Sequence, residues 1–222
     1  MTPFPGGIES LPNGALILSL AAAVAYLAVQ QRTPSLRRSF AKTAAVGLLA
    51  VLAFIQGGPV LLVAALALST AGDAFLAQEG EKPFLAGLAS FLLAHLAYVT
   101  LFLTAGDRLE ILAAEPWRLA LCAVGIVAAL MLLRRLLPVA GPQMRLPVAL
   151  YTIAILAMLL AAATVRAPVI VAGAVLFVVS DSLLAIGRFL LAPGDPRQNA
   201  LGPAVWISYY LAQVAITLGF LL

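Results

Sequence analysis

Charged residues are scarce in this sequence. Asp, Glu, Lys and Arg together make up 10% of the 222 residues, against roughly 25% in an ordinary soluble domain. Hydrophobic residues make up 64%. A soluble fold of this size has too little interior to bury so much apolar surface. The composition therefore excludes an ordinary soluble domain and predicts a chain embedded in a membrane.

The residues needed for disulfides and metal sites are equally scarce. Cys122 is the one cysteine, which excludes an intrachain disulfide. His95 is the one histidine, which argues against membrane zinc hydrolases that need two or three imidazoles. The sequence also lacks a G-x-S-x-G elbow, a phosphate-binding Gly-rich loop and a usable Ser/His/Asp set. We therefore expect no metal and no other cofactor.

Basic residues are in excess, with 13 Lys and Arg against 9 Asp and Glu. They are spread over short segments and lack the aromatic-interleaved stripe of a nucleic-acid-binding surface. We therefore expect no nucleic-acid partner, and we interpret the charge as a signal of membrane topology.

Apolar residues come in blocks of about twenty, the helix length that crosses a hydrocarbon core of roughly 30 Å. Gly, Pro and charge clusters separate these blocks. The predicted spans are 14–31, 39–56, 59–77, 84–104, 117–137, 146–165, 168–190 and 204–222. The predicted fold class is all-α: a polytopic membrane bundle of about eight helices in one transmembrane domain over residues 1–222. The segment before the first span has no Lys or Arg, so we expect that span to be retained and not cleaved as a signal peptide.

Positive charge is divided unevenly between the predicted loops. Those after the first, third, fifth and seventh spans hold Arg32, Arg37, Arg38, Lys42, Lys82, Arg134, Arg135, Arg145, Arg188 and Arg197. The opposite face holds Arg108, Arg118 and Arg166. The positive-inside rule then predicts that the odd-numbered loops are cytoplasmic and that both termini lie outside.

The sequence contains two weak internal matches. Asp73-Ala-Phe-Leu-Ala77 resembles Asp181-Ser-Leu-Leu-Ala185, and His95-Leu-Ala-Tyr98 resembles Tyr210-Leu-Ala-Gln213. An even number of spans separates the copies, so a repeat would give two four-helix halves related by an axis along the membrane normal. Chance matching is the alternative, because Leu and Ala are abundant.

Ionisable residues within spans indicate function, because a charge at bilayer depth is costly and usually faces the bundle interior. We expect Asp73 roughly 6 Å inside the cytoplasmic interface, Asp181 roughly 13 Å and His95 roughly 16 Å. The polar residues expected between about 8 and 14 Å are Tyr209, Tyr210 and Gln213. Polar groups from four spans should therefore converge in the cytoplasmic half of the bundle.

Asp73 and Asp181 are the candidate catalytic pair. Desolvation favours a neutral carboxyl group, and two neighbouring carboxyls resist ionising together, so one could stay protonated at neutral pH. That arrangement places a general acid beside a general base. We expect the two side chains to face one cavity, within about 10 Å of each other. The alternative for Asp73 is a structural role, as a helix cap or in an ion pair with Lys42 or Arg188.

The lone histidine and the aromatic residues also have structural alternatives. His95 is as readily a hydrogen-bonded core residue as a proton-transfer group. The residues that fit an interfacial aromatic belt are Tyr26, Trp117, Tyr151 and Trp206.

Several short motifs occur in order along the chain. They are Ala41-Lys42-Thr43, Ala71-Gly72-Asp73 with Phe75-Leu76, Gly87 followed by Phe91, His95 and Tyr98, Tyr151 with Met158, Gly173-Ala-Val-Leu-Phe177 leading to Ser180-Asp181, and Tyr209-Tyr210 with Gln213. Over essentially the whole chain, this order resembles the YhhN family of membrane proteins, which includes the animal lysoplasmalogenases.

The resemblance implies metal-independent hydrolysis of the vinyl ether bond of lysoplasmalogens. The products would be a fatty aldehyde and glycerophosphoethanolamine or glycerophosphocholine. The family's aspartate positions fall on Asp73 and Asp181. One would protonate the outer alkene carbon, and the other, ionised, would stabilise the oxocarbenium ion and activate water. Lys42 and Arg188 are candidates to bind the substrate phosphate.

The predicted substrate-binding or supporting residues are Lys42, His95, Tyr98, Tyr151, Ser180, Arg188, Tyr209, Tyr210 and Gln213. The predicted partners are a lysophospholipid substrate and the bilayer, which in a bacterium would be the inner membrane. A related lysophospholipid or enol ether is an alternative substrate, and the oligomeric state stays open. A proton-coupled lipid or small-molecule transporter is the alternative function, because intramembrane aspartates and repeats also serve alternating access.

Overall fold

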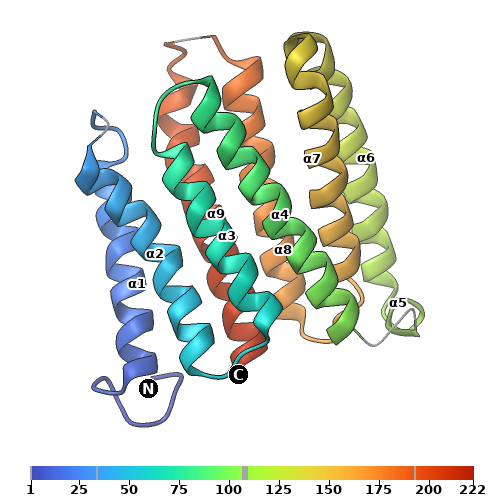
Figure 1. The fold of residues 1–222 in the computed structure, drawn as a ribbon. Coiled ribbons are helices and arrows are strands. Elements are labelled where there is room, and N and C mark those ends of the chain that lie inside the picture. Colours follow the sequence, from blue (N-terminus) through green and yellow to red (C-terminus); the bar gives the residue numbers. More distant parts are fainter. Residues whose placement is uncertain (1, 34, 107–109, 193) are drawn as a thin grey trace.

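The structure is a computed structural model that describes residues 2–33, 35–106, 110–192 and 194–222. The described residues form helices and connecting segments, with no strand among them. The helix bounds are α1 Leu11–Val29, α2 Leu36–Ile55, α3 Val60–Leu76, α4 Glu81–Ala105, α5 Glu110–Ala114, α6 Pro116–Val139, α7 Gly141–Ala162, α8 Pro168–Ala185, the π-helical turn η1 Ile186–Leu190, and α9 Arg197–Leu221. The long helices run side by side, up and down in alternation (Figure 1).

Seven of the described helices are long and apolar enough to cross a membrane, which confirms the predicted all-α membrane bundle. The third predicted span corresponds to α3, which is shorter at 17 residues but packs between α2 and α4. The largest difference in boundaries is at α9, which begins at Arg197 and not near residue 204. Pro203 lies inside this helix, and membrane helices tolerate internal proline.

Six helices form a closed ring in which α2, α3, α4, α7, α8 and α9 each pack against the next. Outside the ring, α1 packs on α2 and α6 packs on α7. Aromatic side chains fill part of the interior: Phe177 packs edge-to-face against Phe91, Tyr98 and Tyr209. The ring brings α3 and α8, which carry the two aspartates, onto opposite walls of one interior.

The helix contacts have the pattern that two four-helix halves, α1–α4 and α6–α9, require. The second helix of each half packs against the fourth helix of the other half, α2 against α9 and α7 against α4. The matched residues Tyr98 and Gln213 bond to each other, with the tyrosine hydroxyl donating to Oε1 at 2.5 Å. A contact between equivalent positions is compatible with two halves related by an axis, and the repeat stays a prediction.

The loops after α1, α3, α6 and η1 lie at one end of the bundle, the upper end in Figure 1, and both termini lie at the other. The upper end carries the ten basic residues counted above and is termed the basic end. At the opposite end Arg118 is fully buried and donates hydrogen bonds to the carbonyls of Ala163, Val165 and Arg166. Arg118 therefore ties the start of α6 to the α7–α8 loop and is not an exposed loop charge. Arg108 lies outside the described residues.

Candidate active site

A cavity of about 790 Å³ lies between α1, α2, α3, α4, α8, η1 and α9. It reaches the basic end, because Gln78 and Glu79 of the α3–α4 loop and Gly194 of the α8–α9 loop line it. Asp73 and Asp181 both line this cavity. The structure therefore brings the two carboxyl groups to one space, as expected for a pair that shares proton chemistry.

Asp73 lies in the last turn of α3 and is 1% exposed. Its Oδ1 is 3.2 Å from Nζ of Lys42 on α2, and its Oδ2 accepts a hydrogen bond of 2.7 Å from the hydroxyl of Tyr209 on α9. The neighbouring Gly72 leaves room for a ring, since a Cβ there would lie 2.6 Å from Cδ2 of Phe91. The ion pair with Lys42 is the structural alternative considered above, and here it lies in the cavity wall.

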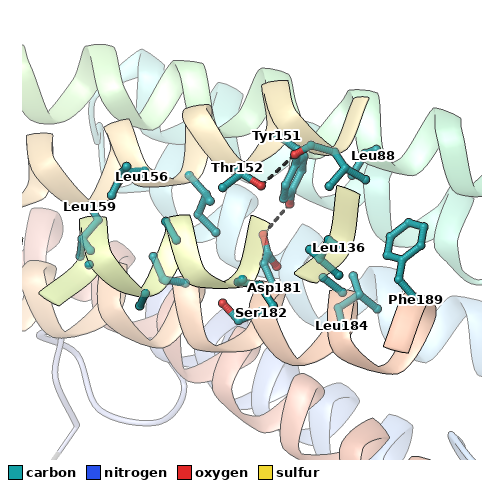
Figure 2. Close-up of a pocket in the computed structure, with 18 of the residues that line it drawn as sticks. Leu88, Leu136, Tyr151, Thr152, Leu156, Leu159, Asp181, Ser182, Leu184 and Phe189 are labelled. Atoms are coloured by element: carbon teal, nitrogen blue, oxygen red, sulfur yellow. Dashed lines mark hydrogen bonds between the residues drawn. The ribbon is translucent and has the colours of Figure 1, made fainter. Parts of the chain in front are cut away.

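Asp181 lies on α8 with a side chain that is 12% exposed. Its Oδ2 accepts a hydrogen bond of 2.5 Å from the hydroxyl of Tyr151 on α7, and Figure 2 shows this bond crossing between the two helices. In the described part of the chain, no Lys or Arg forms an ion pair with Asp181. The two aspartates therefore differ in charge environment, although they share a cavity.

His95 on α4 lies beside Asp181 and is fully buried. Its Nε2 is 3.6 Å from Oδ2 of Asp181, which is too long for a direct hydrogen bond. The imidazole packs edge-on against the rings of Tyr151 and Phe177, at 5.1 and 4.8 Å between centroids. Within the described structure Nε2 has no hydrogen-bond partner. The ring is therefore held by packing next to the carboxyl group.

A second, apolar cavity of about 100 Å³ lies between α4, α6, α7, α8 and η1. Leu, Ile, Val, Ala and Phe side chains make up most of its lining, and Asp181 and Tyr151 lie beside them (Figure 2). Asp181 lines both cavities. It therefore lies where a polar space meets an apolar one.

The remaining predicted polar residues are divided by the fold. Ser180 lines the larger cavity, and its hydroxyl donates to the carbonyl of Val205. The Tyr98 hydroxyl donates a hydrogen bond to Gln213 in the interior of the helix ring. Tyr210 forms a hydrogen bond with Ser19 on α1. None of these last three is among the residues that line the two cavities.

Two arginines from different helices line the larger cavity. Arg188, predicted as a phosphate ligand, lines it from η1 and stacks over the ring of Phe84 at 4.7 Å. Arg38 on α2 also lines it but was considered only as a topology charge. Its Nη1 donates to the carbonyl of Arg32, while its buried Nε has no partner among the described residues. Its position four residues before Lys42, on one helix face, is the signal that could have found it.

The predicted aromatic belt is wrong for Trp206. This side chain is 3% exposed, its Nε1 donates to the carbonyl of Ala23, and it lines the larger cavity. Tyr26 is buried against it, with 4.4 Å between ring centroids, and Tyr151 bonds to Asp181. Only Trp117, at 47% exposure, has the environment of a belt residue among these four. The cause is helix packing, which turned three of the rings inward.

Among the described residues, no group of three or more His, Cys, Asp or Glu side chains could hold a metal ion. What the site contains is two carboxyl groups, each with two partners. A buried carboxylate beside an ammonium group is suited to accept a proton, and a carboxyl group at an apolar boundary is suited to donate one. The arrangement is suited to acid/base chemistry on a substrate with a polar and an apolar part.

The profile of the YhhN family matches residues 37–220 of this chain. That range contains both aspartates and all four of their partners. The chain belongs to the YhhN family. The resemblance inferred from the motifs is thereby confirmed.

Two known proteins are similar to this chain over most of its length. Each is named lysoplasmalogenase, one from Mycobacterium bovis and one from Mycobacterium tuberculosis. Each is 37% identical over 163 residues, which cover 72% of this chain and 59% of the relative. The matched part of the chain thus spans about three fifths of the length of these relatives. No solved structure matches the chain.

Proposed function

We propose that this YhhN-family protein is a membrane-embedded hydrolase that cleaves the vinyl ether bond of lysoplasmalogens. The products are a fatty aldehyde and glycerophosphoethanolamine or glycerophosphocholine. The observation that carries the proposal is that Asp73 and Asp181 line one cavity with different partners, one beside a cation and one without. Family membership and the names of the two relatives support the reaction class.

Asp181 is assigned as the general acid. It has no cationic partner among the described residues and borders an apolar cavity, and such surroundings favour a neutral carboxyl group. Its Oδ2 accepts from Tyr151, which leaves Oδ1 to carry the proton. Asp73 is assigned as the general base, because Lys42 and Tyr209 stabilise a carboxylate and hold it in place.

The reaction then balances with these two groups alone. The Asp181 carboxyl group donates its proton to the outer alkene carbon, and an oxocarbenium ion forms at the carbon bound to oxygen. Asp73 takes a proton from water as the water oxygen bonds to that carbon, which gives a hemiacetal. In the second stage the bond to the glycerol oxygen breaks. Asp73 returns its proton to that oxygen, and the hemiacetal hydroxyl returns one to Asp181.

The phosphate group is assigned to Arg188 and Arg38 at the mouth of the larger cavity. Arg188 makes no ion pair within the described residues, and the Nε of Arg38 has no partner there. Lys42 was predicted as a phosphate ligand, but its ammonium group is directed to Asp73. Its proposed role is therefore to favour the ionised base.

The test is incubation of the purified full chain in detergent with a lysoplasmalogen, followed by mass spectrometry. We expect fatty aldehyde and glycerophosphoethanolamine or glycerophosphocholine in equal amounts. In D₂O the aldehyde should carry deuterium on the carbon next to the carbonyl, because that carbon receives the proton. The matched control is the saturated 1-O-alkyl analogue, which has no alkene to protonate and should not react. Absence of aldehyde from folded protein would overturn the proposal, and a transporter would give that result.

We also propose that the basic end faces the cytoplasm, on the strength of the charge count. The test uses single cysteines in a Cys122→Ala background and a membrane-impermeant maleimide on intact cells. Arg197→Cys at the basic end should be unreactive, although the side chain at this position is 73% exposed. Leu222→Cys at the opposite end, 74% exposed, should react. The reverse pattern would refute this orientation.

A further inference from the structure

The apolar cavity is elongated along the helix axes. Its lining on α7 extends from Val148 to Leu159 and its lining on α6 from Gly125 to Leu136. Each stretch corresponds to about 16 Å of helix. Hydrocarbon chains of bilayer lipids extend in the same direction, along the membrane normal. The cavity therefore has the orientation that a lipid chain already has.

The lining of this cavity offers little for a polar ligand to bind. The hydroxyl of Thr152, which lines it, already donates to the carbonyl of Val148 in its own helix. Asp181 and Tyr151 are bonded to each other at its wall. The polar space with Arg38 and Arg188 begins on the other side of Asp181. A single-chain amphiphile placed across this junction would have its bond between chain and head group beside the acid.

The outer wall of the cavity is α6, which lies outside the helix ring. Ala128 and Ala129 of this helix line the cavity, whereas Val124 and Val127 are 65% and 55% exposed. The helix is closely apposed to α7, since a Cβ at Gly125 would lie 2.6 Å from Cδ2 of Leu159. One helix therefore separates the cavity from the lipid outside.

We propose that this cavity binds the hydrocarbon chain of a single-chain ether lipid, and that the small residues of α6 set its width. The inference rests on the proposed function. At about 100 Å³ the cavity is smaller than the roughly 300 to 1,000 Å³ of sites that enclose a whole small ligand. It therefore encloses the part of the chain nearest the reacting bond, and the rest of the chain stays in the bilayer beside α6.

The experiment measures binding of a 1-O-hexadecyl lysophospholipid to the full protein chain in nanodiscs. This saturated ether is not cleaved. Ala129→Leu narrows the cavity, and Ala123→Leu makes the same change on the exposed face of α6. We expect Ala129→Leu to weaken binding by about tenfold or more, the scale on which an apolar site rejects extra bulk. Ala123→Leu should stay within about twofold of wild type, because it alters only a lipid-facing surface. Nanodiscs of one lipid composition make partitioning of the ligand equal for all variants.

A second variant widens the cavity and keeps the test decisive if the first fails to fold. Leu156→Ala removes a half-buried lining side chain and should improve binding of a chain that carries a methyl branch near the ether bond. Two results would overturn the proposal that the apolar cavity binds the hydrocarbon chain. One is equal affinities for folded Ala129→Leu and Ala123→Leu, and the other is no gain in affinity for the branched lipid in Leu156→Ala. If the binding pattern is as expected but the wild-type protein releases no aldehyde, the proposed function is overturned. The assignment of the apolar cavity to the hydrocarbon chain is then still supported.

Discussion

The surroundings of Asp73 and Asp181 differ although the two residues occupy corresponding helices. Asp73 on α3 is 1% exposed, is paired with the Lys42 ammonium group at 3.2 Å and accepts from Tyr209. Asp181 on α8 accepts from Tyr151, has the His95 ring next to it and borders an apolar cavity. A cation pairs with the first carboxyl group, whereas no Lys or Arg among the described residues pairs with the second.

The partners come from matching places in the two halves. Each aspartate receives one partner from the second helix of its own half, Lys42 on α2 or Tyr151 on α7. Each receives the other from the fourth helix of the opposite half. The two carboxyl groups thus have matched helix positions but different charge partners: Lys42 pairs with Asp73, whereas no Lys or Arg among the described residues pairs with Asp181. The difference lies in side-chain identity and not in helix arrangement.

The largest effect should come from Asp→Asn substitutions, which keep shape while removing the proton chemistry. Asp181→Asn should lower kcat by about a thousandfold and Asp73→Asn by at least about a hundredfold, within the usual range for acid or base assistance. The acid matters more because carbon protonation creates the reactive cation that water then attacks. Aldehyde release measures kcat, and thermal melting in detergent verifies folding. Full activity in either folded variant would contradict the two-aspartate mechanism.

Lys42→Met should lower kcat at neutral pH by about ten- to a hundredfold and distort the pH profile in one direction. The profile should be bell-shaped, with limbs that belong to the coupled pair. Activity falls at low pH when the base becomes protonated. Without the cation the protonated form of Asp73 is favoured, so the acidic limb should move to higher pH by more than the alkaline limb does. Lys42→Arg should restore the acidic limb. Equal movement of both limbs would mean that Lys42 does not act through Asp73.

The two tyrosines provide a smaller and matched comparison. Tyr151→Phe removes a hydrogen bond from the carboxyl group that has no cation, whereas Tyr209→Phe removes one from the carboxylate that keeps Lys42. A hydrogen bond of this kind contributes about 0.5 to 1.5 kcal/mol. We expect kcat to fall by about tenfold in Tyr151→Phe and by about threefold in Tyr209→Phe. Equal losses would show that the cation does not distinguish the two sites.

The smallest effect on turnover should come from the cavity mouth. Arg188→Gln should raise KM by about five- to tenfold and leave kcat within about twofold, because a phosphate contact is similar in ground and transition states. Arg197→Gln is the control at the same end of the bundle. Hydrogen bonds from Arg197 hold the pKa of Asp195 at about 2, so this surface pair stays ionised and occupied at every assay pH. A KM effect as large in the control would remove the assignment of the phosphate to Arg188.

The sequence by itself determined the spans and the ionisable residues of the interior. Blocks of about twenty apolar residues have no stable place other than a bilayer, so hydropathy identified seven of the long helices and the shorter α3 without any tertiary information. The cost of an intramembrane charge likewise identified Asp73 and Asp181 as residues of the interior, and both line the larger cavity. The ordered motifs were sufficient for the family, because they are a property of the chain alone.

Tertiary structure alone decided which groups became partners. In a membrane the lipid-facing and the interior side of a helix are both apolar, so periodicity does not show how each helix is rotated. That rotation turned Trp206 and Tyr151 inward, directed the Lys42 ammonium group to Asp73, and buried Arg118 under the α7–α8 loop. The apolar cavity at Asp181 is formed by five helical segments together. Its existence depends on the spacing between them, and no single segment of sequence encodes that spacing.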